Sequence, residues 1–157
     1  MGSMVPVLER VELFEGMAPE HLRTLAECAT DASYAPGEFV SRAGDEADAF
    51  WLIRSGRVVL EIFLPGRGEV TLANMSEGDI VGFSWLLPPY RMRFDILAVT
   101  ATETVRFDGR VLRLKCREDA EFGFQLMSRF ARIVADRVEA MNMQLLDIYG
   151  HHPIESE

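Results

Sequence analysis

The sequence is poor in the residues that build metal centres and disulfide frameworks. Its 157 residues include two cysteines, Cys28 and Cys116, and three histidines. The cysteines have no Cys-x-x-Cys spacing and no neighbouring histidine, so we expect two free thiols in a reduced, cytoplasmic protein. His21 lies in a predicted helix, and His151 and His152 lie in a polar tail, whereas metalloenzymes with a β-barrel fold carry several histidines on facing strands. We therefore expect no metal and no metal-dependent catalysis.

Long apolar runs, a secretory signal and an excess of positive charge are also missing. No apolar run approaches the length of a membrane-spanning helix, and the N-terminus has no basic segment followed by an apolar stretch. Sixteen basic residues stand against 25 acidic ones, and the formal net charge of -9 disfavours a phosphate backbone as partner. Seven residues follow Gly150, too few for a helix-turn-helix. We expect no membrane contact, no direct DNA binding and, without a Gly-x-Ser-x-Gly motif, no catalytic nucleophile.

The hydrophobic pattern divides the chain into four segments. Apolar residues at helical spacing predict a helical cap over 8–32. Short β-rich runs then recur at intervals of roughly 8–12 residues between glycine-containing turns, which predicts a β-sandwich or barrel over 33–109. Helical spacing returns over 110–150, and 151–157 form the polar tail. The runs expected as strands are 39–40, 50–53, 58–63, 70–75, 80–83, 94–100 and 105–107.

The C-terminal helix carries an apolar stripe that is too long for one face of a barrel to cover. We expect its distal half to pair with the helix of a second copy, giving a two-fold homodimer. The alternative is that the helix folds wholly onto its own barrel. Gly150 is the expected end of the helix. The expected dimer contacts are Met127, Phe130, Val134, Met141, Leu145 and Ile148, with Arg129, Arg132, Asp136, Arg137 and Glu139 on the opposite, polar face.

Four consecutive stretches carry a resemblance to a known family. Residues 36–40 (PGEFV), 42–45 (RAGD), 47–53 (ADAFWLI) and 55–58 (SGRV) resemble the first half of a cyclic-nucleotide-binding domain, with glycines at 37, 44, 56, 78 and 82. The resemblance covers roughly 8–149, so we expect 1–157 to be one such domain. It implies a mainly β fold, a double-stranded β-helix or jelly roll with N-terminal helices and a long C-terminal helix. It also implies a non-enzymatic regulatory or sensor role in signalling.

The family's phosphate-binding cassette resembles Phe-Gly-Glu-Leu-Ala, a short helix and then Pro-Arg-Ala-Ala-Thr. There the glycine turn and the arginine hold the cyclic phosphate and the glutamate holds the ribose hydroxyl. The matching stretch here is 81–98, in which Gly82 is the cassette glycine. The glutamate position is Phe83, and the arginine position, ten residues after Gly82, is Met92. Arg93, Phe94 and Asp95 follow in place of the small residues and the threonine.

These replacements work against a cyclic nucleotide. Losing a charged hydrogen bond costs about 1.5–3 kcal/mol, Phe94 adds bulk, and Asp95, if it faces inward, would repel the phosphate. We expect no tight binding of cAMP or cGMP and no other cofactor. The alternative is a register slip of one residue, which would present Arg91 or Arg93 to the phosphate and make the chain a genuine cyclic-nucleotide receptor.

The aromatic residues of this stretch, Phe83, Trp85, Tyr90 and Phe94, leave three interpretations open. They fill the former pocket, they line a modified pocket for a more apolar ligand, or they form a patch for an unidentified protein partner. Ser84 is expected to cap the short helix. A further hypothesis, a small barrel enzyme, requires a titratable cluster inside the barrel. The candidate pocket residues are Gly82, Phe83, Ser84, Trp85, Arg91, Met92, Arg93, Phe94 and Asp95.

Overall fold

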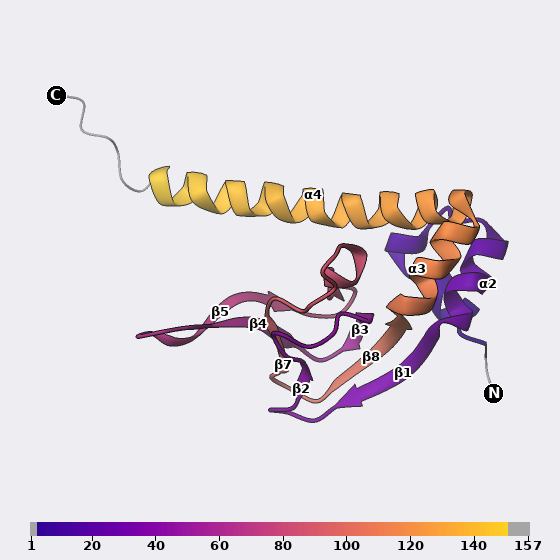
Figure 1. Cartoon of the computed structure of the whole chain (residues 1–157). Coiled ribbons are helices and arrows are strands. Elements are labelled where there is room, and N and C mark those ends of the chain that lie inside the picture. The colour runs from indigo at the N-terminus through magenta and orange to yellow at the C-terminus, as the bar shows by residue number, and fades with distance from the viewer. Residues whose placement is uncertain (1–2, 151–157) are drawn as a thin grey trace.

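Helices flank a β-rich body at both ends of the chain (Figure 1). The computed structural model describes residues 3–150, and side chains through 148. The polar tail expected over 151–157 lies outside the described residues. Two short helices and a 3-10 turn come first, and two helices close the chain. Their bounds are α1 (Val5–Glu9), η1 (Glu12–Phe14), α2 (Pro19–Glu27), α3 (Gly109–Glu118) and α4 (Ala120–Gly150).

Eight strands form two four-stranded antiparallel sheets, in the orders β1-β8-β3-β6 and β2-β7-β4-β5. This is the predicted jelly roll with N-terminal helices and a long C-terminal helix. The strands are β1 (Ala29–Tyr34), β2 (Phe39–Ser41), β3 (Ala49–Ser55), β4 (Val58–Leu64), β5 (Gly68–Met75), β6 (Ile80–Val81), β7 (Asp95–Ala98) and β8 (Thr102–Asp108).

The first strand begins earlier than the sequence pattern predicts. The helical cap was expected over 8–32, but α2 ends at Glu27 and β1 runs from Ala29 to Tyr34. Each residue of β1 pairs with β8, from Ala29 opposite Phe107 to Tyr34 opposite Thr102. None of its side chains is fully buried, so the strand lacks the strong apolar alternation that makes strands visible in a sequence. Pairing with β8, not local pattern, decides its conformation.

The core consists of two layers that meet at β3. Side chains on a strand alternate between faces, and β3 is buried on both. Trp51 and Ile53 face the space between the sheets, where they pack with Val58, Met92 and other apolar residues. Phe50 and Leu52 face the helices, where they pack with residues of α1, α2, α3 and α4. The helices are therefore joined to the same strand that supports the interior of the jelly roll.

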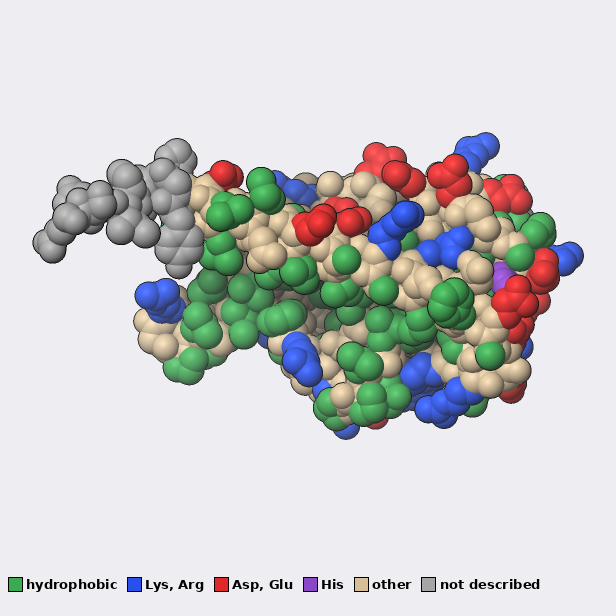
Figure 2. Space-filling model, turned by 90° about the horizontal axis from the view of Figure 1, so that it is seen from above, with side chains coloured by type: hydrophobic (Ala, Val, Ile, Leu, Met, Phe, Trp, Pro, Cys, Tyr) green, Lys and Arg blue, Asp and Glu red, His purple; other side chains and the backbone are tan. Residues whose placement is uncertain are grey.

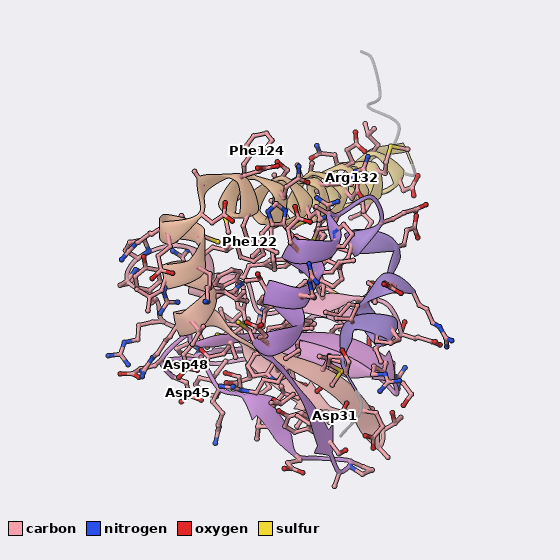
Figure 3. All side chains as sticks on the ribbon, turned by 90° about the vertical axis from the view of Figure 1, so that its right-hand side faces the viewer. Asp31, Asp45, Asp48, Phe122, Phe124 and Arg132 are labelled. Carbon is pink, nitrogen blue, oxygen red and sulfur yellow. The ribbon has the colours of Figure 1, made fainter. Side chains whose placement is uncertain are left out.

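The long helix α4 divides into a packed and an exposed part. Phe122, Leu126 and Phe130 are each at most 2% exposed and belong to the helix-side core. Phe122 points into the molecule, whereas Phe124, 71% exposed, points away from it (Figure 3). The expectation that Phe130 contacts a second copy is wrong, because its ring is enclosed by rings of its own chain. Beyond Ile133 the apolar side chains are exposed, namely Val134, Val138, Met141, Met143, Leu145, Leu146 and Ile148.

This exposed part of α4 runs above the β4–β5 hairpin (Figure 1). The alternative in which the helix folds wholly onto its own jelly roll predicts burial of these apolar side chains, whereas they are 44% exposed or more. Over residues 3–150, none of the helices combines the length and the apolar character needed to cross a bilayer.

Candidate ligand pocket

A glycine turn after β6 sets up the candidate site. Gly82 has a φ of +90°, a conformation that residues with a Cβ adopt only at a cost. A Cβ added there would lie 3.1 Å from the Trp51 ring and 3.3 Å from the Ala49 carbonyl oxygen. The turn leads into η2 (Ser84–Leu86). Ser84 was expected to cap this element, but it is the first residue inside it and no side-chain cap hydrogen bond forms.

Trp85 lies in the core and not in the pocket, contrary to the sequence-based expectation. Its side chain is fully buried and its ring lies 5.2 Å from that of Phe50 and 5.4 Å from that of Phe130. Its carbonyl oxygen accepts a hydrogen bond of 2.8 Å from Arg113 Nη1. The aromatic packing draws the ring toward α3 and α4, so that Trp85 anchors the turn from behind. Tyr90 also lies aside, beneath the Arg113 guanidinium at 4.2 Å.

Met92 points into the jelly roll at the position expected for the phosphate-binding arginine. Its N–H donates to Asp45 O at 2.9 Å and its carbonyl oxygen accepts from Gly44 N at 2.8 Å. These bonds set the register, and the Met92 side chain, 6% exposed, joins the core between the sheets. The neighbouring Arg91 and Arg93 are exposed. The residue that points inward, Met92, is therefore apolar, and the arginines before and after it in the chain are exposed at the surface.

Asp95 is not a pocket residue. It lies on β7 beside Ile96, which faces the interior, so the alternation of the strand turns Asp95 to the outer face. Its Oδ1 accepts a hydrogen bond of 2.8 Å from Ala43 N. The repulsion of a bound phosphate that an inward Asp95 would cause is therefore absent.

A hollow of about 340 Å³ remains beside Gly82 and Met92. The aromatic residues therefore do not fill the former pocket, since Trp85 and Tyr90 lie elsewhere and Phe83 and Phe94 form part of its wall. No carboxylate, histidine or cysteine is among its lining residues, so the small-enzyme hypothesis finds no acid–base group here. Nowhere in residues 3–150 do three or more His, Cys, Asp or Glu gather as a metal site would require. The hollow is lined by Leu60, Gly82, Phe83, Ser84, Leu87, Pro89, Arg91, Met92, Arg93, Phe94, Ile96 and Arg137.

Arg137, from α4, is the pocket residue that sequence reasoning missed. Its guanidinium lies over the Phe83 ring, 4.4 Å from the centroid, and its Nη2 donates to the Ile80 carbonyl oxygen. The same Nη2 lies 3.6 Å from Met75 Sδ. Burial lowers the pKa of Arg137, and the charge of Asp79 acts in the opposite direction.

Arg137 was assigned to the polar face of the helix, which is wrong. It follows Leu126, Phe130 and Ile133 at steps of four, three and four residues, which places all four residues on one face. A charged residue on the buried stripe of an amphipathic helix was the available signal. Residue type alone points Arg137 to solvent, whereas its spacing along the helix places it on the buried face.

Comparison with known proteins gives the same family as the motifs. The model of the cyclic nucleotide-binding domain family matches residues 32–119. A CRP-like cAMP-activated global transcriptional regulator of Mycobacterium tuberculosis is 25% identical over 145 residues, which are 92% of this chain and 63% of the regulator. The chain therefore spans less than two thirds of the length of that regulator.

Solved structures agree with this assignment. A cyclic nucleotide-binding domain from Methylobacillus flagellatus superposes with a TM-score of 0.78 at 18% identity, covering 94% of this chain and 86% of that one. The catabolite activator protein of Thermus thermophilus superposes with a TM-score of 0.65 at 26% identity, covering 86% of this chain and 62% of that one. With the glycine turn, the two sheets and the matched segment 32–119 together, the chain belongs to the cyclic nucleotide-binding domain family.

Proposed function

We propose that the chain is a non-catalytic regulatory domain that binds neither cAMP nor cGMP tightly and acts through a protein partner. The observation that carries this proposal is the buried Met92 at the position where the family's cassette has its arginine. A thioether cannot donate a hydrogen bond to a phosphate, and the Met92 side chain packs in the apolar core between the sheets. The missing contact is worth about 1.5–3 kcal/mol for each charged hydrogen bond.

Phe83 removes the second nucleotide contact. The family's glutamate accepts from the ribose hydroxyl, but the Phe83 ring offers no such acceptor. It also packs edge-on against Phe130 at 5.7 Å and lies beneath Arg137 at 4.4 Å. A ribose at this position would lose its polar partner and meet an apolar ring.

Isothermal titration with cAMP and with cGMP tests the proposal directly. We expect no binding with a dissociation constant below about 10 µM, which corresponds to roughly 7 kcal/mol of binding free energy. Tighter binding of either nucleotide would overturn the claim.

A second candidate function is a cyclic-nucleotide receptor that uses Arg91 or Arg93. Both arginines line the hollow, and neither takes part in an ion pair among residues 3–150. If this function holds, cAMP raises the melting temperature of the parent chain, and Arg93→Ala or Arg91→Ala abolishes the rise. An unchanged melting temperature in the parent at millimolar cAMP removes this candidate.

We also propose that the domain is a homodimer through the distal half of α4. Val134, Val138, Met141, Leu145 and Ile148 follow one another at steps of four, three, four and three residues, the spacing of a two-helix seam. All are at least 44% exposed. Hydrophobic side chains gather along this flank of α4 and on the adjoining β4–β5 hairpin (Figure 2), where Phe63 is 65% and Leu72 is 49% exposed. An apolar surface of this extent is typical of a subunit interface.

Sedimentation velocity tests the dimer with a matched pair of variants. Met141→Glu puts a charge into the seam and should yield monomers. Met143→Glu makes the same change on the opposite side of the helix, where Met143 is equally exposed at 60%, and should leave the dimer intact. Dimers that persist with Met141→Glu, or that are lost equally with both variants, would contradict the assignment of the seam.

A further inference from the structure

The hollow beside Gly82 combines an apolar lining with positive charge alone. Its inner surface is formed by Leu60, Met92 and Ile96, and two phenylalanines form part of its wall. Its only charged lining residues are three arginines. A concave apolar pocket with a few convergent polar groups is the usual form of a small-molecule site. The lining suits a molecule with an apolar body and a negative charge.

Arg137 is the partly buried arginine of this hollow, and it forms no ion pair with a carboxylate of the described residues. Its hydrogen-bond partners are the carbonyl oxygen of Ile80 and the sulfur of Met75, and its guanidinium lies over the Phe83 ring, so all three contacts are with uncharged groups. Within residues 3–150, no carboxylate lies in ion-pair distance of it and no hydrogen bond is made by its Nε or Nη1. The charge of Asp79 acts on Arg137 without forming an ion pair with it. Burial of the guanidinium is therefore only partly compensated, and an anion bound to it would lower the remaining cost.

The geometry favours a carboxylate over a more highly charged group. The planar guanidinium fork matches the two oxygens of a carboxylate. Only Arg137 is partly withdrawn from water, since Arg91 and Arg93 are exposed at the rim. One half-buried guanidinium balances one negative charge, whereas a dianion would remain partly uncompensated in apolar surroundings.

We propose that this pocket binds a monoanionic carboxylate with an aromatic or alkyl body, its carboxylate held by Arg137 and its body against Phe83 and Phe94. The proposal rests on the proposed function and names the ligand class of that regulatory domain. A volume of about 340 Å³ is near the lower end of the range of about 300–1,000 Å³ seen for ligand pockets. The ligand is therefore a small molecule of one or two rings or a short alkyl chain.

Titration of the unaltered chain with 2-naphthylacetate and with its neutral analogue 2-naphthylacetamide tests the charge requirement. We expect the carboxylate to bind with a dissociation constant below about 1 mM and the amide to bind at least about tenfold more weakly. Equal affinities, or no binding of the carboxylate at about 5 mM, overturn the proposal.

A pair of arginine variants tests the role of Arg137. Arg137→Gln should weaken 2-naphthylacetate at least about tenfold and leave 2-naphthylacetamide unchanged. Arg132→Gln removes the same charge from an exposed position of α4 (Figure 3) and should bind like the parent. Parent-like carboxylate binding by Arg137→Gln overturns the proposal. If that variant does not fold, the acid–amide comparison on the parent decides.

A parallel titration with cAMP separates this inference from the proposed function. Binding of cAMP below about 10 µM would overturn the proposed function. Failure of 2-naphthylacetate alone would overturn the ligand class and leave the proposed function standing.

Discussion

Replacing Phe130 by alanine tests whether this residue belongs to the core of one subunit or to a dimer interface. The Phe130 ring is 2% exposed and has ring centroids of Phe50, Trp85 and Phe83 at 4.9, 5.4 and 5.7 Å. Removing a buried phenylalanine side chain costs about 3–5 kcal/mol from lost transfer energy and the cavity left behind. Three edge-on aromatic contacts place Phe130 toward the upper end of that range.

Urea denaturation followed by circular dichroism measures the loss. Phe124→Ala is the matched control, because the same side chain is removed from the same helix at a position that is 71% exposed, where we expect a change of less than about 0.5 kcal/mol. In thermal unfolding, Phe130→Ala should lower the melting temperature by about 6–20 °C, from about 2–4 °C per kcal/mol for a chain of this size.

The dependence on protein concentration identifies the origin of the loss. The difference in unfolding free energy between Phe130→Ala and Phe124→Ala should be the same at two concentrations about twentyfold apart, because a contact within one chain does not depend on association. A loss below about 1 kcal/mol, or a variant that simply becomes monomeric at unchanged monomer stability, would refute the assignment of Phe130 to the core.

Three further predictions concern backbone, cap and thiol. Gly82→Ala should lower the unfolding free energy by about 1–3 kcal/mol in urea denaturation, because its φ is +90° and the new Cβ would lie 3.1 Å from the Trp51 ring; a neutral effect would exclude the strain. Asp108 is the N-cap of α3, and its Oδ1 accepts hydrogen bonds from the N–H groups of Arg110 and Val111 at 3.0 and 3.1 Å. Asp108→Ala should therefore lower the unfolding free energy by about 0.5–2 kcal/mol, and Asp108→Asn by less. Equal losses in the two variants would argue against this capping role. Burial, followed by the charge of Asp108, raises the pKa of the Cys28 thiol to about 11, whereas an unfolded cysteine titrates near about 8.5. The contribution of Cys28 to the unfolding free energy should therefore be constant below about pH 8 and should fall as the pH rises from about 8.5 to 11. The urea midpoints of the parent and of Cys28→Ala should diverge across this pH range. Midpoints that change with pH in parallel would contradict the raised pKa of Cys28.

The site shows where sequence reasoning works and where it stops. The resemblance to the family's cassette identifies Met92, ten residues after Gly82, as the inward position. The backbone hydrogen bonds of Met92 with Asp45 and Gly44 accompany this inward placement of its side chain. Strand alternation shows that Asp95 faces outward, but only once the pairing of β7 with β4 fixes which residues face in. Trp85 could not be assigned, since an aromatic residue in a turn can pack toward either layer.

The sequence by itself determined the order of the elements, the turns that need glycine and the apolar character of the cassette, because these depend on local conformational preference and on residues near one another in the chain. Only the tertiary structure decided that β1 is a strand, that Phe130 is enclosed and that Arg137 reaches the pocket. Each of these depends on a contact between distant segments, such as Arg137 with Ile80, 57 positions earlier. The spacing along α4 places Arg137 on the buried face of the helix, but which groups it meets there is set by how α4 packs across the sheet.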